Sequence, residues 1–176
     1  AISYKEIFQL IRANKLWLGA TCNSEDMVFG VPEGTEVNPK DKLKAEKLGY
    51  VGNYTRLGNA CWFTNMHIKK REVAFNSGID FEYGMKMGWY QKYDNYDAIN
   101  VGRTNQIPMD YDGIMGVPIS FLDKHNPDQF EIIGLLASAG YDAEQIGIPI
   151  TWDKKEGRGV VNGKVAFARI LIRAKR

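Results

Sequence analysis

The pattern of apolar and polar positions along the chain predicts one helix followed by a series of short strands. Near the start, Ser3 and Glu6 have the spacing of a capping box, which satisfies backbone N–H groups of a first helical turn. Apolar residues then recur with helical spacing at Ile7, Phe8, Leu10 and Ile11. Together these features predict a helix over residues 3–15.

Strands are predicted where compact apolar runs stand between turn-forming residues. The runs are residues 16–20, 26–31, 60–64, 114–122 and 130–136. Pro118 lies inside the fourth run, so we expect a bulge or an edge position there. At the C-terminus, the dipeptide Asn162-Gly163 predicts a hairpin over residues 158–173, because it favours the tight turn between paired strands.

Strands outnumber helices in this reading, which predicts an α/β fold that is not doubly wound, because a doubly wound sheet needs helices on both faces. Two regions interrupt the pattern. Residues 32–49 are polar and rich in lysine, so we expect an exposed loop or a short surface helix. Residues 72–112 have weak periodicity and are dense in Gly, Asn, Asp and Tyr, which predicts a loop-rich region that is functional or poorly ordered.

The composition of the 176-residue chain, with 44% apolar and 25% charged residues, is that of a globular protein rather than a disordered one. No stretch approaches the ~20 apolar residues of a membrane-spanning helix, so we expect no membrane partner. Only Cys22 and Cys61 are present, which favours a reducing cytoplasm. The chain opens without Met and almost directly on a helix N-cap, so we expect a piece of a longer protein.

Charge is unevenly distributed behind a net charge of +2. Residues 40–71 and residues 151–176 each carry eight basic and two acidic residues, a net +6 in both blocks. Residues 1–39 have a net charge of −2, and residues 72–150, with four basic and twelve acidic residues, have −8. If the basic blocks meet in space they form a face that neutralises phosphates, and otherwise they are solvated surface.

No short catalytic motif is present: the chain lacks G-x-S-x-G, a P-loop and G-x-G-x-x-G. The two cysteines, His67 and His125 lack the spacing of metal ligands, which predicts buried structural cysteines and surface histidines. The acidic middle has two open interpretations, either acid–base or Mg²⁺ chemistry or a satisfied loop hydrogen-bond network. Its candidate carboxylates are Asp94, Asp97, Asp110 and Asp112.

Aromatic and amide residues are dense between residues 89 and 111. Aromatic rings stack on nucleic-acid bases, and Asn or Gln amides hydrogen-bond base edges. The alternative is that the tyrosines pack a loop onto the core and leave their hydroxyls in water. The residue types alone favour neither interpretation.

Several runs in colinear order resemble one family. The longest are KYDNYDAINV at residues 92–101 and DYDGIMGVPISFLDKHNPDQFEIIG at residues 110–134. Shorter runs are ISYKEIF at residues 2–8, WFTN at residues 62–65 and ARILIR at residues 168–173. Together they resemble the C-terminal half of adenine-specific DNA methyltransferases of the EcoRI modification type.

The resemblance implies an enzyme that moves a methyl group from S-adenosylmethionine to the N6 of adenine in duplex DNA, with the target base flipped out of the stack. It also implies the late part of a Rossmann-like methyltransferase sheet, with antiparallel C-terminal strands and an appended loop-rich region. The family's Asn/Asp-Pro-Pro-Phe/Tyr catalytic loop and Gly-rich cofactor loop are absent, and we expect both upstream of residue 1. This implies that the chain alone holds no cofactor and is inactive, and that its partners are double-stranded DNA and the N-terminal half of the same polypeptide.

Within residues 1–176, the resemblance divides the chain into late sheet strands and a basic loop (1–71), a loop-rich region of possible target recognition (72–112), and closing strands with a hairpin (113–176). Loops after the strands face DNA in this class. The first candidates for DNA contact are Asn65, Lys69, Lys70 and Arg71, and the second are Tyr93, Asn95 and Tyr96. Two alternatives remain open: a self-standing nucleic-acid-binding module, and a metal-dependent hydrolase that uses the acidic middle.

Overall fold

The computed structural model describes residues 2, 4–20, 27–56, 61–137 and 157–176. The chain divides into two compact units. Unit 2 comprises Leu18–Met66, and unit 1 comprises Ala1–Trp17 together with His67–Arg176. Unit 1 is assembled from both ends of the chain.

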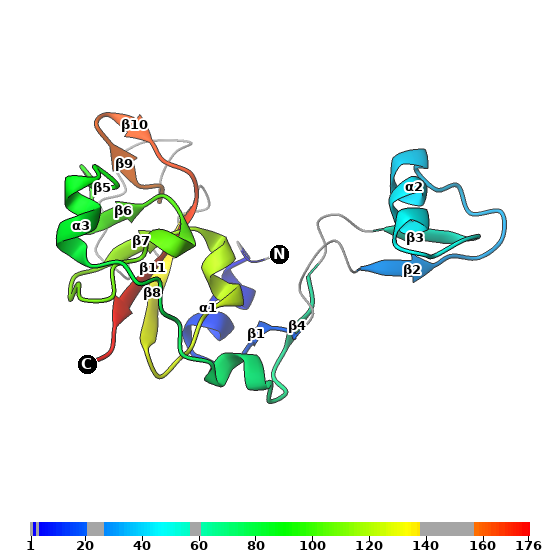
Figure 1. Ribbon diagram of the computed structural model, residues 1–176, viewed down its shortest axis with the longest axis horizontal. Coiled ribbons are helices and arrows are strands. Elements are labelled where there is room, and N and C mark those ends of the chain that lie inside the picture. The colour runs from blue at the N-terminus through cyan, green and yellow to red at the C-terminus, as the bar shows by residue number, and fades with distance from the viewer. Residues whose placement is uncertain (1, 3, 21–26, 57–60, 138–156) are drawn as a thin grey trace. The chain divides into compact units, whose positions relative to one another are not determined.

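Unit 1 is built on a mixed five-stranded sheet with the strand order β5-β6-β7-β11-β8 (Figure 1). Strands β6 and β7 run parallel, and the other neighbours are antiparallel. The strands are β5 (Tyr90–Lys92), β6 (Ile99–Val101), β7 (Met115–Val117), β8 (Phe130–Leu136) and β11 (Arg169–Ala174). A mixed sheet with antiparallel strands at the C-terminal end confirms the expected fold class.

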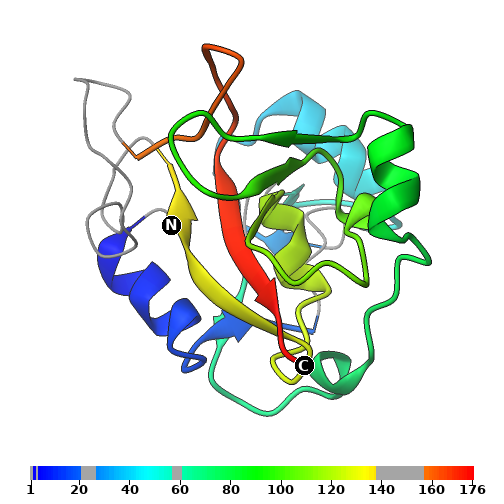
Figure 2. The same cartoon turned by 90° about the vertical axis from the view of Figure 1, so that its left-hand side faces the viewer.

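The longest strands, β8 and β11, lie side by side and carry much of the core (Figure 2). Their register shifts between Leu171 and Ile172, which face Gly134 and Ile132, so Ile133 is the extra residue of a β-bulge. Leu171 and Ile172 are both fully buried. The β8 range agrees with the predicted strand 130–136, because its apolar run is long and continuous.

Helix α1 (Lys5–Arg12) contacts β8 and buries Phe8 and Ile11. The predicted helix is therefore confirmed, but it is shorter at both ends than the expected range 3–15. The N-cap is Tyr4, which makes no side-chain cap hydrogen bond, and Ser3 lies outside the described residues. The apolar face of the helix, rather than a capping box, holds it on the sheet.

The segment 72–112 contains more regular structure than the sequence predicted. Besides β5 and β6 it holds the helix α3 (Phe81–Lys86) and the 3₁₀ turn η2 (Thr104–Gln106). A further 3₁₀ turn, η1 (Lys69–Glu72), ends at the first residue of this segment. The expectation of a loop-rich region missed β5 and β6 because their residues, Tyr-Gln-Lys and Ile-Asn-Val, do not form compact apolar runs.

Pro118 does not mark a sheet edge, contrary to the prediction. Strand β7 ends at Val117 and lies between β6 and β11, in the interior of the sheet. Pro118 is the N-cap of the following 3₁₀ helix η3 (Ile119–Asp123). Proline cannot donate a ladder hydrogen bond, so it ends the central strand instead of continuing it.

The C-terminal hairpin is confirmed in part. Strands β9 (Val160–Val161) and β10 (Lys164–Val165) pair antiparallel, and Asn162 and Gly163 have φ angles of 49° and 71°, which the tight turn between them requires. After residue 165 the chain leaves the hairpin and enters the sheet as β11, paired with β7 and β8. The second predicted strand is therefore two strands.

Unit 2 is a small α/β unit. Strands β2 (Val28–Gly30) and β3 (Tyr54–Arg56) form an antiparallel pair, against which α2 (Pro39–Lys47) packs through the fully buried Ala45. The Asn38 side chain caps α2 by accepting a hydrogen bond of 2.9 Å from the Lys40 N–H. Strands β1 (Trp17–Leu18) and β4 (Phe63–Thr64) pair where the chain enters and leaves this unit. Of the two alternatives for residues 32–49, helix α2 supports the short surface helix, whereas β3 was not predicted.

Candidate nucleic-acid interface

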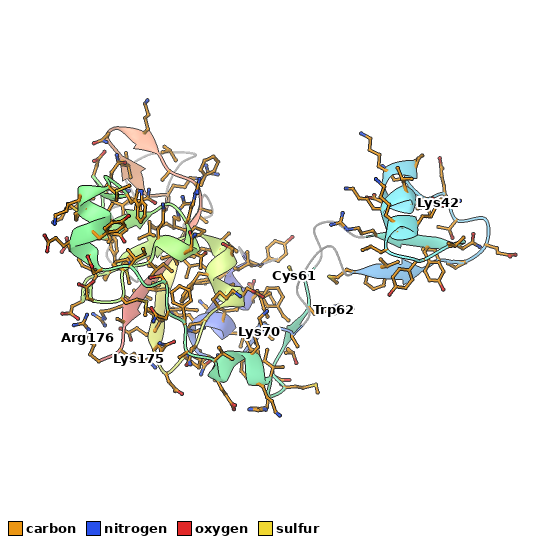
Figure 3. All side chains as sticks on the ribbon, in the orientation of Figure 1. Lys42, Cys61, Trp62, Lys70, Lys175 and Arg176 are labelled. Atoms are coloured by element: carbon orange, nitrogen blue, oxygen red, sulfur yellow. The ribbon has the colours of Figure 1, made fainter. Side chains whose placement is uncertain are left out.

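Two of the three cations in the 69–71 run are engaged within unit 1. Lys70, which is labelled in Figure 3, forms an ion pair with Asp123. Arg71 lies 4.0 Å over the Trp17 ring and donates a hydrogen bond to the Asn14 side-chain oxygen. Burial lowers the pKa of Arg71, and the nearby Asp128 carboxylate opposes that shift. Lys69 is exposed on η1, so it is the cation of this run that faces water.

Tyr93 is a core residue of unit 1, only 5% exposed. Its hydroxyl donates a 3.0 Å hydrogen bond to Asn100 Oδ1, and burial raises its pKa. Its ring covers Gly116 and Gly159, where an added Cβ would lie 2.2 Å from the Tyr93 hydroxyl oxygen and 2.3 Å from a ring carbon, respectively. A larger residue at either glycine would therefore collide with the Tyr93 side chain.

Asp94 and Asn95 hold the β9–β10 hairpin through its backbone, and we call this pair the hairpin clasp. The Asn95 amide donates to the Arg158 carbonyl and accepts from the Val160 N–H, both at 2.9 Å. The Asp94 carboxylate accepts from the N–H groups of Asn162 and Gly163, at 3.2 and 2.7 Å. The side chains of the clasp thus hydrogen-bond to backbone groups of a hairpin some 65 residues further along the chain.

Tyr96 is half-buried beside the same hairpin. It packs against the cluster formed by Tyr93, Ala98, Leu136 and Leu171. Burial raises its pKa, Arg173 opposes this, and Asp97 adds to it. Asn65, by contrast, follows β4 in unit 2 and is exposed.

The seven candidates for DNA contact therefore fall into three groups: the η1 cations, the residues around the hairpin, and Asn65. Their contact with DNA remains a prediction.

Two aromatic residues between 89 and 111, Tyr90 and Tyr111, stack on Phe81. The Phe81 ring lies between Tyr90, at 5.6 Å between ring centroids, and Tyr111, at 4.6 Å. The Tyr90 hydroxyl donates to the Gln106 carbonyl at 2.6 Å. Burial, with Asp110 and Asp80 nearby, raises the pKa of Tyr90 to about 12. For these rings the structure favours the packing alternative.

The four aspartates of the acidic middle have separate partners. Asp110 accepts the Phe81 N–H at 2.6 Å, Asp112 pairs with Arg176 at 2.7 Å, and Asp97 lies 4.0 Å from Lys92. Asp94 belongs to the hairpin clasp. Among the described residues, no three His, Cys, Asp or Glu side chains gather as a metal site would require. The alternative of a loop hydrogen-bond network accounts for Asp94 and Asp110, whereas Asp112 and Asp97 lie beside surface cations.

The cysteine and histidine predictions are partly wrong. Cys61 is exposed rather than buried, and Cys22 lies outside the described residues. His67 is at the surface, as predicted, 2.6 Å from Glu72. His125 is only 8% exposed, because its ring packs on Phe121 and its Nε2 lies 2.9 Å from the Phe130 carbonyl oxygen. Burial lowers the pKa of His125.

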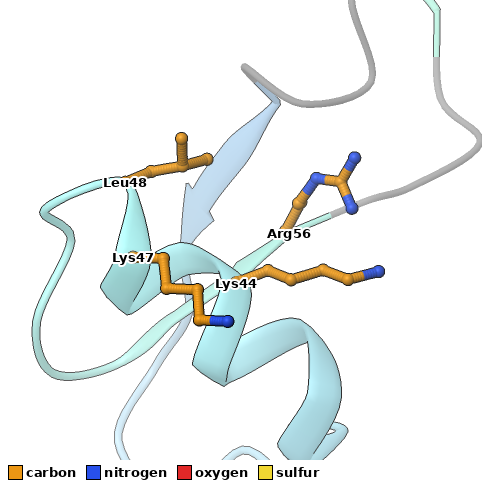
Figure 4. A pocket seen from close by; sticks show the side chains of 4 residues that line it. All are labelled: Lys44, Lys47, Leu48 and Arg56. Carbon is orange, nitrogen blue, oxygen red and sulfur yellow. The ribbon is translucent and has the colours of Figure 1, made fainter.

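A cationic pocket in unit 2 is the feature that the sequence reasoning missed. Lys44, Lys47, Leu48 and Arg56 line a pocket of about 370 Å³ between α2 and β3 (Figure 4). The helical spacing of the lysines gave a usable signal, because Lys44 and Lys47 are three residues apart and share a face. Arg56 could not be placed beside them without β3.

Comparisons with known proteins bear on the whole chain. The profile of the family described as "Adenine-specific methyltransferase EcoRI" matches residues 1–175. The chain therefore belongs to the EcoRI adenine-specific methyltransferase family. No solved structure matches the chain significantly.

Three curated relatives are Type II methyltransferases. The chain is 39% identical over 177 residues to M.EcoRI of Escherichia coli, with all of the chain and 48% of the relative covered. It is 35% identical to M.MgeORF184P of Mycoplasma genitalium and 33% identical to M.MpnI of Mycoplasma pneumoniae, covering 54% of each. The chain thus spans about half the length of the curated relatives it matches. In the part of the chain that the structure describes, no helix has the length and apolar character to cross a membrane.

Proposed function

We propose that this chain is the C-terminal part of an S-adenosylmethionine-dependent methyltransferase that modifies the N6 of adenine in duplex DNA within a restriction–modification system. The observation that carries the proposal is the family match over residues 1–175. The printed names of the relatives, all Type II methyltransferases, support it. The protein would act in the cytoplasm.

The pocket of unit 2 does not suit S-adenosylmethionine. That cofactor carries a sulfonium cation and an adenosine, whereas the pocket of unit 2 is lined by three cations and no carboxylate. Like charges repel, so this pocket is suited to an anion. We therefore assign cofactor binding and the chemical step to the N-terminal half of the longer polypeptide, and derive no step of methyl transfer from this chain.

The role proposed for this chain is to complete the sheet and to contact DNA. Lys69 and Asn65 are exposed and suit direct contact, Lys69 with a phosphate and Asn65 with a base edge. Lys70, Arg71, Tyr93, Asn95 and Tyr96 have partners inside unit 1. We propose that these five act by positioning the surface rather than by touching DNA.

The test is methyl transfer by two proteins, this chain alone and the longer polypeptide extended at its N-terminus. Each is incubated with isotopically labelled S-adenosylmethionine and adenine-containing duplex, and methylated bases are identified by mass spectrometry. We expect N6-methyladenine from the longer polypeptide and background label from the chain alone. Turnover by the chain alone, or a longer polypeptide that binds DNA without methylating adenine, would contradict the proposal, and the second result would favour a binding module.

A further inference from the structure

Lys44, Lys47 and Arg56 converge on one pocket although they come from two elements. Lys44 and Lys47 occupy the last turn of α2, and Arg56 is the last residue of β3, which packs against that helix. Their side chains line the same pocket, together with Leu48 (Figure 4). The three positive charges are therefore held in one place by the packing of a helix on a strand.

This arrangement carries an electrostatic cost within the protein. Cations three or four residues apart on a helix repel one another, and a third cation on the adjacent strand adds to that repulsion. The pocket lining includes no carboxylate. In the part of the chain that the structure describes, neither Lys44 nor Lys47 has an ion-pair partner. An anion from outside the chain would remove the repulsion.

The helix dipole accounts for only part of the cluster. Cations near a helix C-terminus are stabilised by the unpaired carbonyl groups there, which explains why lysines are tolerated at positions 44 and 47. It does not explain Arg56, which lies on a strand. It also does not explain the apolar wall of the pocket, formed by Leu48, which remains 45% exposed.

We propose that the pocket of Lys44, Lys47 and Arg56 binds one backbone phosphate of duplex DNA. The inference rests on the proposed function, since it takes DNA as the partner. The guanidinium and ammonium groups would donate hydrogen bonds to the phosphate oxygens, with Arg56 able to engage two of them at once. Leu48 would pack against the adjoining deoxyribose, which gives the pocket a reason to prefer a sugar–phosphate chain over a free oxyanion. The contact positions DNA and reads no sequence.

The experiment measures binding of a fluorescent duplex to this chain over a range of salt concentrations. The test variants are Lys44→Gln, the double variant Lys44→Gln/Lys47→Gln, and the triple variant that adds Arg56→Gln. The matched control is Lys42→Gln, which removes one charge from the same helix (Figure 3). With 3.6 residues per turn, Lys42 lies about 200° around the helix from Lys44 and about 140° from Lys47. Circular dichroism and the thermal midpoint report folding, and the double variant leaves β3 intact.

We expect Lys44→Gln to weaken binding several-fold and Lys42→Gln to bind like the original chain. Loss of one phosphate contact should reduce the slope of log affinity against log salt by about 0.9 in the double variant. Equal effects of Lys42→Gln and Lys44→Gln would overturn the inference, because net charge alone would then explain them. Stronger competition by inorganic phosphate than by chloride at equal ionic strength, lost in the double variant, would reassign the pocket to a free oxyanion.

The same variants in the longer polypeptide separate this inference from the proposed function. If adenine is methylated but the pocket variants keep the original salt slope and affinity, the pocket assignment fails and the function stands. If the longer polypeptide does not methylate adenine while the pocket variants still lose the phosphate contact to duplex DNA, the function fails and the pocket stands. A chain that binds no duplex at any salt concentration overturns the pocket assignment directly.

Discussion

The hairpin clasp of unit 1 and the cationic pocket of unit 2 both consist of polar side chains from segments that looked suited to DNA contact. In the clasp, the amide of Asn95 and the carboxylate of Asp94 are matched to backbone groups of the β9–β10 hairpin. In the pocket, three cations meet with no carboxylate among them. The clasp therefore has its hydrogen-bond partners inside the protein, whereas the pocket gathers cations that suit an anion from outside.

The difference separates residues that stabilise the fold from residues that bind. A buried polar group that loses its partner costs stability, whereas an exposed cation that is removed costs almost none. Substitutions around the clasp should thus change the free energy of unfolding, and substitutions in the pocket should change DNA affinity. A clasp variant that changed only DNA affinity, or a pocket variant that changed mainly the free energy of unfolding, would contradict this distinction.

The largest effect is expected from Tyr93, which packs over Gly116 and Gly159 beneath the clasp. Tyr93→Ala should lower the free energy of unfolding by about 3–5 kcal/mol, because it removes a buried aromatic ring and leaves a cavity. Tyr93→Phe keeps the ring and loses only the hydrogen bond to Asn100, so about 1 kcal/mol is expected. Denaturant unfolding measures both. A stable Tyr93→Ala protein with weakened DNA binding would instead make Tyr93 a base-stacking residue.

A smaller loss is expected from the clasp itself. Asn95→Ala leaves the Val160 N–H and the Arg158 carbonyl without their amide partner, which should cost about 1–3 kcal/mol. The matched control is Asn65→Ala, at an exposed position, where a change within about 0.5 kcal/mol is expected. Unfolding of both variants in denaturant gives the comparison. Equal stability of the two proteins would show that the clasp contributes nothing to unit 1.

Stability should also depend on pH through His125. Its pKa is lowered in the folded protein by burial and by the positive charges of Arg71 and Lys175, against a backbone hydrogen bond to Phe130 that acts in the opposite direction. The unfolded chain therefore binds a proton first as the pH falls. Stability should be full above about pH 6.5, the ordinary histidine pKa, and decline below it.

The control for this titration is a pair of substitutions. His125→Phe should make the free energy of unfolding decline less as the pH falls below about 6.5. The free energy of unfolding is measured at a series of pH values. His67→Phe, at an exposed histidine, should leave the decline in place. A decline that disappears in the His67 variant and persists in the His125 variant would show that the wrong histidine had been assigned.

The sequence predicted best the elements with long continuous patterns. The run 130–136 became β8 without a change of boundary, and Asn162-Gly163 formed the turn it indicates. Strands β3, β5 and β6 escaped prediction because their residues, Tyr-Thr-Arg, Tyr-Gln-Lys and Ile-Asn-Val, do not form compact apolar runs. Their existence depends on partners elsewhere in the chain rather than on local preference.

The candidate site was harder to predict, because burial and pairing are properties of the fold. The 69–71 run reads as three equivalent cations, yet Lys70 pairs with a residue 53 positions away and Arg71 with one 57 positions away. The lysine face of α2 is visible in the sequence through its helical spacing. Arg56 completes the pocket only because β3 packs against α2, which local sequence does not specify.

The smallest effects are expected within that run, and they test whether one short segment holds both kinds of residue. Lys70→Ala breaks a half-exposed ion pair with Asp123 and should cost at most about 1 kcal/mol of stability. Lys69→Ala should change stability by less than about 0.5 kcal/mol. If Lys69 meets a phosphate, its loss should reduce the salt slope of DNA binding by about 0.9 and weaken all duplex sequences alike. The double variant Lys70→Ala/Asp123→Ala removes both partners of the ion pair. Comparing it with the single variant separates the loss of the ion pair from the loss of the positive charge of Lys70. Should Lys70→Ala change the salt slope as much as Lys69→Ala with no loss of stability, Lys70 must leave Asp123 to bind DNA, and the 69–71 run would then act as one binding surface after all.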